Sequence, residues 1–504
     1  MGDISFPNIP QNIRVPLFYA DIDPSKANTG QQTQRALIIG QILSSGTGTP
    51  NTPQICQGVS DAASVGGQGS MLAMMTAAYR KRDTFGEVWY LPLADDPSSV
   101  AATGSLNFTS VPTVTGVLSL YVAGRIVSLA VTPSMTAAQI ATALVAQIGT
   151  LPHLPVTAAV DGTTATKANL TAKNKGLAGN DIDLQLNYGG TAAGEATPAG
   201  LAVTITPMSG GATNPSTLTA ALANLGDREF DFIALPYTDS ASLNAIKSFL
   251  STQTGRWSWS EQLYGGAYAA YRGTLGALTT FGVTRNDEHV SIMGFNGSPT
   301  PCWVIAADLT AAVAVSARAD PAQPLQTVTL ATMRAPPLPL RFALTDRNTL
   351  LYDGISTFSV GDDGTVSIEN LITTYQKNSF GNADDSYLEV ETMNTLTFVL
   401  RDLKSVVTTK YARKKLAANG TRVVPGTNVV TPNMIRADLI ARYKTLEENG
   451  YVQGSSVFAQ GLIVQQNSQN PNRVDVLYPA ILIDQLRILA LLMQFSNIVP
   501  ATAS

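Results

Sequence analysis

Both ends of the chain carry apolar segments that cannot be helices and have no adjacent strand to pair with. In the first arm, residues 1–29, prolines 7, 10 and 16 exclude a helix interior, and Pro479 does the same in the last arm, residues 473–504. The side chains that we expect to contact a host sheet are Ile13, Val15, Leu17, Tyr19, Val474, Val476, Tyr478, Leu489 and Leu491. Because an unpaired strand requires a host sheet, we expect neighbouring copies of the chain to provide it.

Strand and helix patterns alternate after the first arm. Residues 35–43 and 87–93 are short apolar runs typical of buried strands. Between them, residues 69–82 place methionines along one face, which predicts a helix with Ser70 at its start. A strand, a helix and a second strand at this spacing favour a parallel α/β sheet.

The same alternation returns after residue 212. Strands are predicted over 230–237 and 289–295, and a serine-capped helix over 240–253. Residues 303–319 predict a helix that is apolar on nearly all sides and therefore buried between layers. We assign these elements to one discontinuous central α/β domain, residues 30–97 and 212–355.

Between the two halves of that domain lies a segment of different composition, residues 98–211. Short runs of Val, Thr, Leu and Ala alternate with glycine-rich turns, and a helix is predicted only over 136–148. We expect an inserted β-rich outer domain that decorates the surface.

The C-terminal domain, residues 356–472, is predicted to be α+β. Its stretch 383–416 predicts a long amphipathic helix whose basic end contains the candidate contact residues Lys410, Arg413, Lys414 and Lys415. Thr431 and Pro432 mark the start of a second helix, and residues 457–467 are predicted to be a strand. The basic end is either a solvated face or a contact with an acidic partner.

Composition excludes several classes of function. The net charge of −4 and the absence of a Lys/Arg-rich arm argue against nucleic acid binding. Charged residues make up 13% of the chain, about half the usual share, which favours self-association. Cys56 and Cys302 indicate neither a disulfide framework nor a metal site.

No signal peptide pattern is present, so we expect the chain to remain in the cytoplasm. Asp308 interrupts the most apolar internal run, and Asp484 and Arg487 interrupt the C-terminal one. We therefore expect no membrane insertion and interpret both runs as buried elements.

Three long sequence segments near the C-terminus carry a family resemblance: KYARKKLAANGTRVVPG (410–426), TPNMIRADLIARYKTLEENG (431–450) and PNRVDVLYPAILIDQLRILALLMQF (471–495). Together with the first arm, they resemble the tail sheath proteins of Mu-like contractile-tailed bacteriophages. The resemblance implies a subtilisin-like central domain and a C-terminal domain that lies near a tail tube. It also implies other copies of the chain, the tail tube protein and the baseplate and tail terminator proteins as partners.

An enzyme is the competing hypothesis. The residues around Ser70 superficially resemble the nucleophile motif of subtilisins, but Ser70 precedes both histidines, His153 and His289, which reverses the order of that family. We interpret Ser70 as a helix cap and both histidines as solvent-facing loop residues. Glycines 40, 46 and 48 follow a strand but lack the spacing and the lysine of a phosphate loop.

The sequence therefore predicts a structural subunit with no catalytic, cofactor or metal site. It would polymerise as a helical sheath around a tail tube in the virion, be assembled in the host cytoplasm, and contract to drive the tube through the host envelope. An α/β hydrolase-like enzyme with an accessory β domain, or the sheath of a related bacteriocin or secretion system, remains as the alternative.

Overall fold

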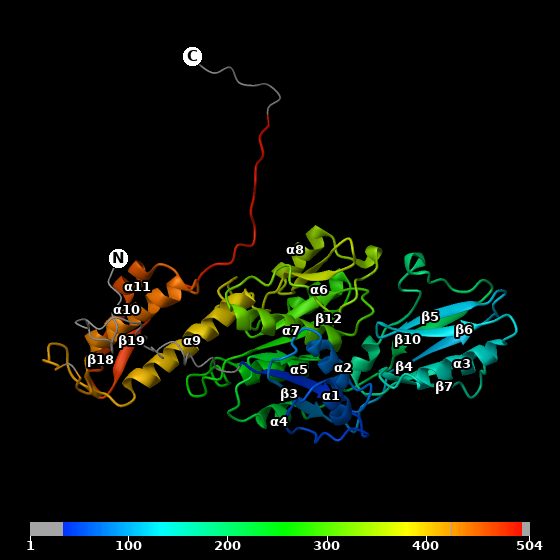
Figure 1. Cartoon of the computed structure of the whole chain (residues 1–504), viewed down its shortest axis with the longest axis horizontal. Coiled ribbons are helices and arrows are strands. Elements are labelled where there is room, and N and C mark those ends of the chain that lie inside the picture. The colour runs from blue at the N-terminus through cyan, green and yellow to red at the C-terminus, as the bar shows by residue number, and fades with distance from the viewer. Residues whose placement is uncertain (1–33, 425, 496–504) are drawn as a thin grey trace, which may run out of the picture.

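The computed structural model describes residues 34–424 and 426–495, which form an elongated molecule of mixed α/β architecture (Figure 1). The inserted segment lies at one end of the long axis. Helices α10 (Pro432–Glu448) and α11 (Ser455–Gly461) lie at the other end. The first-arm residues Ile13, Val15, Leu17 and Tyr19 lie outside the described residues.

A six-stranded sheet occupies the middle of the molecule, in the order β13-β12-β11-β1-β3-β2. Its strands are β1 (Ala36–Gln41), β2 (Gln54–Ile55), β3 (Val88–Leu93), β11 (Phe232–Ala234), β12 (Gly266–Arg272) and β13 (Val290–Phe295). All neighbours run parallel except β2, which is antiparallel to β3. The parallel sheet expected from the apolar runs is confirmed, and its strands come from both sides of the insertion.

Helices cover both faces of this sheet. They are α1 (Val59–Gly66), α2 (Met71–Arg80), α4 (Leu218–Ala223), α5 (Ser240–Leu250), α6 (Leu275–Gly282), α7 (Cys302–Ala319) and α8 (Leu344–Tyr352). Helices α2 and α7 pack on each other and on β1 and β12. Because the strand order reverses direction after β3, right-handed crossovers place α4, α5 and α6 on the opposite face.

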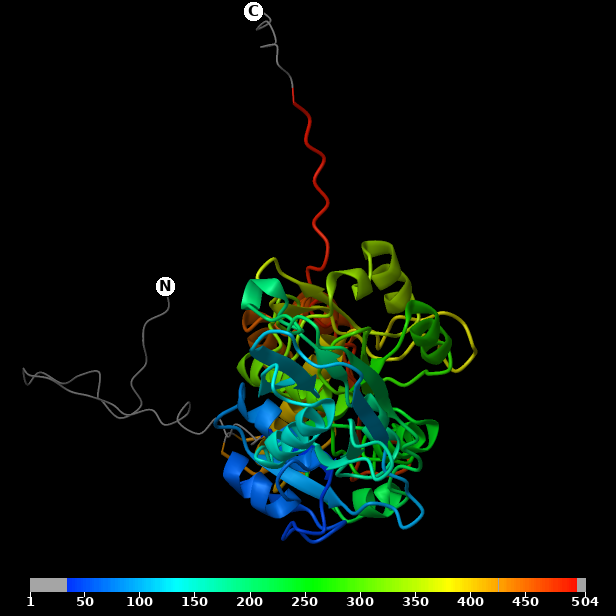
Figure 2. The ribbon, with the colours of Figure 1, turned by 90° about the vertical axis from the view of Figure 1, so that its right-hand side faces the viewer.

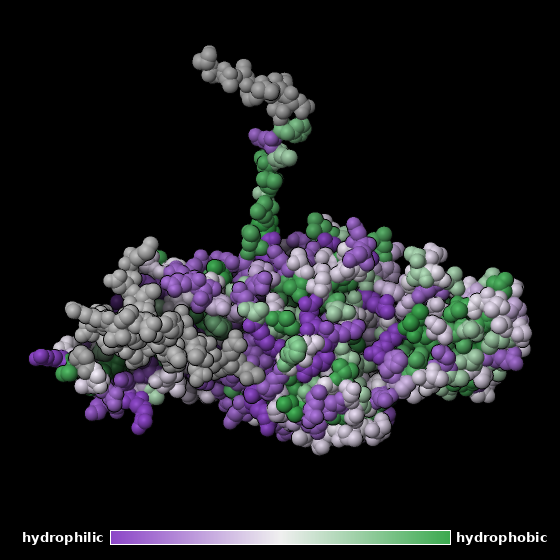
Figure 3. Space-filling view, viewed as in Figure 1, coloured by the Kyte–Doolittle hydropathy of each residue, from purple (hydrophilic) through white to green (hydrophobic). Residues whose placement is uncertain are grey.

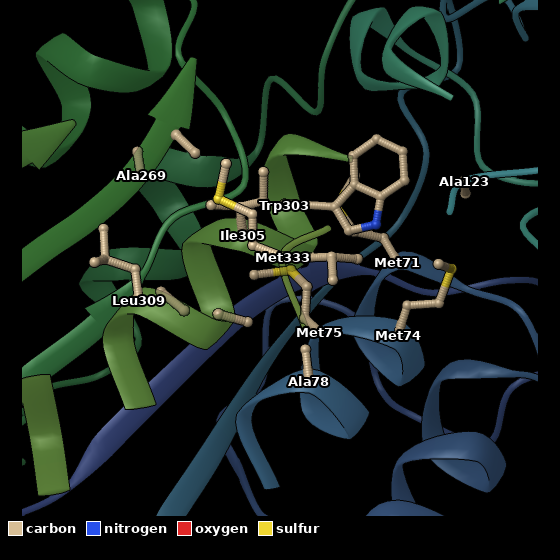
Figure 4. Packing of buried hydrophobic residues seen from close by; sticks show 14 of the residues in the cluster. Met71, Met74, Met75, Ala78, Ala123, Ala269, Trp303, Ile305, Leu309 and Met333 are labelled. Atoms are coloured by element: carbon tan, nitrogen blue, oxygen red, sulfur yellow. The ribbon is translucent and has the colours of Figure 1, made fainter. Parts of the chain in front are cut away.

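The contact between α2 and α7 is dense and apolar (Figure 4). Met71, Met74 and Met75 of α2 meet Trp303 and Ile305 of α7, and all five are buried. Among the described residues α7 is the one helix long and apolar enough to cross a membrane, and it is 72% buried inside the fold. The predicted role of this run as a buried element is confirmed.

The insertion contains two antiparallel sheets. Strands β4 (Thr103–Phe108), β7 (Val156–Val160), β8 (Lys167–Ala172) and β10 (Val203–Ser209) form one, and β5 (Gly116–Val122), β6 (Arg125–Val131) and β9 (Leu184–Leu186) form the other. Helix α3 (Ala137–Gly149) packs on both, and two 3-10 helices, η2 (Leu177–Asp181) and η3 (Thr191–Ala193), lie in loops. Its apolar core is continuous with that of the central sheet.

The C-terminal part begins with α9 (Val390–Tyr411), the longest helix in the described residues. It is followed by β16 (Lys415–Leu416), β17 (Val429–Val430), α10, α11, β18 (Ile463–Gln466) and β19 (Val474–Leu477). Val390 belongs to the central core, whereas Val399 belongs to a second core formed by α10, α11 and β18. Helix α9 therefore joins the two cores.

Three expectations are corrected by the structure. The hairpin of β14 (Thr357–Val360) and β15 (Val366–Asn370), preceded by the 3-10 helix η4 (Leu338–Leu340), packs in the central core, so the boundary between the cores lies along α9 and not at residue 356. Asp239, not a serine, caps α5 by accepting the amide of Ser242. The first half of 457–467 is helical because it continues α11.

Candidate subunit contact sites

The crevice at the carboxyl ends of the central strands is where an open α/β sheet would bind a ligand. Here the loop between β8 and β9 occupies it. Asn174 Oδ1 accepts the amide of Met71, the first residue of α2, at 2.8 Å. The Asp181 carboxylate accepts the amide of Cys302, the first residue of α7, and pairs with Arg272 at the end of β12. The insertion thus places its own polar groups at the two helix N-termini that could otherwise hold an anion.

The glycine-rich loop after β1 is explained by close packing. An added Cβ at Gly46 would lie 2.4 Å from the carbonyl oxygen of Val65, and one at Gly40 would lie 2.9 Å from the backbone of Leu72. The Gly48 amide donates to the Val65 carbonyl at 2.9 Å. These glycines let the loop and β1 approach α1 and α2.

Ser70 is a fully buried helix cap, as predicted from the sequence. Its hydroxyl accepts the amide of Ala73 at 3.1 Å. His153 is exposed in a loop of the insertion, and partial desolvation of its ring, together with the nearby charges of Arg125 and Lys173, lowers its pKa. His289 precedes β13 and therefore lies at the amino ends of the strands. Ser70 lies at the opposite edge of the sheet, at the carboxyl ends of the strands.

His289 is not solvent-facing, which corrects the sequence interpretation. Its side chain is buried and stacks on Trp257 with ring centroids 4.5 Å apart. Burial lowers its pKa to about 4, partly opposed by the carboxylate of Glu288, 3.6 Å from Nε2. The ring borders a cavity of about 30 Å³ under α9, which has room for about one water molecule.

The described residues offer no group of three His, Cys, Asp or Glu side chains able to hold a metal ion. Nor do the described contacts connect Ser70 to either histidine.

The basic residues at the end of α9 divide into two kinds. Lys410 pairs with Asp438 of α10 at 2.6 Å, so part of its charge is used within the subunit. Arg413, Lys414 and Lys415 lie beyond the helix and are exposed, although Lys414 Nζ reaches Asn428 Oδ1 at 3.3 Å. This basic tip, Arg413 to Lys415, is at the end of the molecule opposite the insertion (Figure 1).

The hairpin of β18 and β19 is an incomplete sheet. It has two strands among the described residues, with Val464 opposite Val476 and Ile463 opposite Leu477. Val464 faces the second core, but Ile463 and Leu477 are 50% and 60% exposed. Because the outer edge of each strand has no partner strand among the described residues, this hairpin is suited to receive a further strand.

The predicted C-terminal arm is divided by the structure. Val474 and Val476 pair with β18 of the same chain, and Tyr478 packs on Phe458 with ring centroids 4.6 Å apart. Val474 and Tyr478 therefore pack against the C-terminal core of their own subunit, whereas Val476 pairs with β18 but is 44% exposed. Leu489 and Leu491 are on a segment that leaves the body.

That free arm, residues 488–495, extends away from the molecule in both ribbon views (Figures 1 and 2) and is largely apolar (Figure 3). Its most exposed large side chains, each 73–84% accessible, are Ile488, Leu489, Leu491, Leu492, Met493 and Phe495. The expectation that this run is a buried element is therefore wrong for the single subunit. Apolar residues on both faces are typical of a strand that is covered on both sides.

Sequence reasoning missed the ion pairs that hold the arm in place. Arg487 Nη2 lies 2.6 Å from a Glu389 oxygen and 2.7 Å from a Glu391 oxygen, at the start of α9. Burial raises the pKa of Glu391, and the Arg487 guanidinium opposes that shift. The signal that could have indicated these ion pairs is a charged residue within an apolar run. Arg487 is such a residue, and so is Asp308.

Comparison with known proteins gives two family matches. A family described as the phage tail sheath protein central domain matches residues 210–374, and one described as the phage tail sheath C-terminal domain matches residues 382–496. The Mu-like prophage FluMu tail sheath protein of Haemophilus influenzae is 39% identical over 494 residues, 98% of this chain and 99% of that protein.

Solved structures similar to the chain include two sheath tail proteins. The one from Desulfitobacterium hafniense has a TM-score of 0.46 at 14% identity and covers 94% of this chain and 97% of its own. The one from Listeria innocua has a TM-score of 0.48 at 13% identity and covers 91% and 94%.

Proposed function

Because the chain belongs to the phage tail sheath protein family, we propose that it is the repeating subunit of a contractile tail sheath. Copies stack as a helical array around a tail tube, and the array shortens to drive the tube through the host envelope. The partners are other copies, the tube protein and the baseplate and tail terminator proteins. Assembly takes place in the host cytoplasm, and the finished sheath is part of the virion tail.

One observation carries the proposal. The subunit has both an exposed apolar arm and an incomplete sheet, the β18–β19 hairpin, and the arm does not extend toward that hairpin. The arm, residues 488–495, leaves the body in a direction away from β18 and β19, so it reaches a neighbour more readily than its own hairpin (Figure 1). Burying six large apolar side chains contributes about 10 kcal/mol before ordering costs. The link is then strong enough to persist while subunits rotate.

Contacts with the tube are weak and charged, in contrast to the strong apolar contact of the arm. The basic tip presents exposed charges, and exposed ion pairs contribute only about 0–1 kcal/mol each. Many such contacts position the subunit on the tube and still allow it to slide. Strong arm links combined with weak tube contacts are what a sheath requires to shorten as one body.

We propose that the protein has no catalytic activity of its own. Two features support this: the insertion occupies the usual ligand crevice, and Ser70 serves as a helix cap. The relation of the central domain to subtilisin is part of the proposal and rests on the parallel sheet covered by helices on both faces.

The test removes the free arm. A chain ending at Arg487 is expected to fold and remain monomeric, because residues 488–495 contribute little to either core. The full chain is expected to form tubes visible by negative-stain electron microscopy. Normal tubes from the truncated chain would contradict the proposal.

A further inference from the structure

The segment between β19 and the free arm, residues 478–487, runs from the C-terminal core back to the central core. We call it the strap. Its first half bonds to the loop before α11: the Gln453 amide donates to Ile481 O at 2.9 Å and the Ile483 amide to Tyr451 O at 3.2 Å. Its last residues reach the loop after α7, where Gln326 Nε2 donates to Leu486 O at 3.3 Å.

Arg487 ends the strap with a two-carboxylate clamp. It contacts Glu389 and Glu391, and the other Glu391 oxygen accepts the amide of Leu325 at 2.6 Å. The Glu391 side chain is 1% exposed and the Arg487 side chain 17%. The clamp therefore joins three segments: the end of the strap, the start of α9 and the loop after α7.

A buried carboxylate that loses its cation is strongly destabilising, so this clamp resists opening. Both carboxylates also lie at the N-terminus of α9, where the helix dipole favours negative charge. Beyond Arg487 the described side chains are exposed and make no comparable contact. The chain is thus fixed up to Arg487 and free from Ile488 onward.

The position of the clamp decides what a pull on the arm would do. Without it, tension would load the strap's bonds to Tyr451 and Gln453, and once these break it would peel Leu477 from Ile463 at the end of β19. With it, tension stops at Glu389 and Glu391 on the central side of α9. The hairpin that receives a neighbour's arm is then isolated from the load on its own arm.

We propose that Arg487 is a positioning residue that anchors the free arm to the central domain and protects the acceptor hairpin during contraction. This inference rests on the proposed function, in which a neighbouring copy holds the arm. One ion-pair cluster then separates the free arm from the acceptor hairpin of the same subunit.

The first experiment is hydrogen exchange on the full-length monomer. In Arg487→Ala, the Ile483 amide and the strap peptides are expected to exchange about tenfold faster than in the natural chain. The double variant Arg487→Gln with Glu391→Gln removes both buried charges and keeps the test valid if the single variant fails to fold. Unchanged strap exchange in that double variant would overturn the anchor.

The matched control is Arg347→Ala with Glu369→Gln, which removes another partly buried Arg–Glu pair, 2.8 Å apart, in the central domain. It is expected to leave strap exchange unchanged. If it accelerates the strap as much as the clamp variant does, the effect is general loosening and the inference is wrong.

The second experiment uses assembled tubes under shear flow. Tubes of the clamp double variant are expected to be at least threefold shorter than control tubes, because loaded arms now peel acceptor hairpins. If the tubes of both variants are equally long although strap exchange is accelerated, Arg487 anchors the strap but does not protect the acceptor hairpin under tension. If removing residues 488–504 leaves assembly intact, the proposed function fails, whereas the exchange result still decides whether Arg487 fixes the strap.

Discussion

Asp308 is a charged residue inside the apolar helix α7, and hydrogen bonds from the following loop satisfy its carboxylate. Its fully buried carboxylate accepts the amides of Ala331, Thr332 and Met333 and the Thr332 hydroxyl, at 2.6–3.2 Å. The residue therefore fixes the loop after α7 against the helix, and its charge is compensated by four donors.

Asp308→Ala is expected to lower the free energy of unfolding by about 2–4 kcal/mol, because four donors, of which the Met333 amide is buried and the other three are partly buried, lose their acceptor. Asp362→Ala, at an exposed position, is the control and should change stability by less than about 0.5 kcal/mol. Chemical denaturation of the monomer measures both. A loss below about 1 kcal/mol for Asp308→Ala would mean that water replaces the carboxylate.

His289 makes stability depend on pH. Its pKa is about 4 in the fold and about 6.5 when unfolded, so the unfolded chain takes up more protons between these values. Its contribution to stability is therefore complete above pH 6.5 and is lost as the pH falls toward 4. Asp287, whose pKa burial raises to about 6, acts in the opposite direction.

His289→Gln removes one titration and leaves that of Asp287. The stability of the natural chain relative to the variant should fall by up to about 3 kcal/mol between pH 7 and pH 4.5. Denaturant titrations at four pH values measure this difference. A difference that is constant with pH would show that the imidazole is solvated in the fold.

At the scale of the element, local signals were more reliable than long-range ones. Ser70 and Thr431 cap α2 and α10 as the sequence indicates, because capping depends on residues three positions apart. The helix over 455–461 was missed because a short apolar run fits either a helix or a strand. The burial of His289 and the partners of Arg487 depend on segments far apart in the chain, which spacing alone cannot place.

The insertion is bound more closely to the central domain than its composition suggests. Its two ends lie side by side, since Val100 and Ala212 pair in an antiparallel bridge. A Gly/Ser linker in place of residues 98–211 is therefore expected to preserve the fold and to give tubes of smaller outer diameter.

The same replacement removes the caps provided by Asn174 and Asp181 and uncovers Met71, so the melting temperature should drop by several degrees. Calorimetry and microscopy of the purified variant measure the two effects. Failure to assemble would show that the insertion carries contacts between copies.

The basic tip allows a prediction about the tube. Arg413→Glu with Lys415→Glu should weaken cosedimentation with tail tubes in a salt-dependent way, since exposed charges are screened over about 10 Å at 0.1 M salt. Lys81→Glu, an exposed change in the central domain, is the control. Unaltered cosedimentation at low salt would assign the tube contact to another surface.

At the scale of the whole molecule, the parts lie in a functional order along the long axis. The insertion is at one end, the central sheet in the middle and the hairpin with the basic tip at the other end (Figure 1). We infer that the tip faces the tube and the insertion faces outward. The free arm leaves between them, where it can join one subunit to the next.

The most direct measurement is a helical reconstruction by electron cryo-microscopy of tubes formed by the purified chain, at a resolution that traces the backbone. The account predicts that residues 488–495 form a strand on the β18–β19 hairpin of a neighbouring copy, with Arg487 still bonded to Glu389 and Glu391 of its own. An arm that folds back onto its own subunit, in tubes held together by other surfaces, would contradict it.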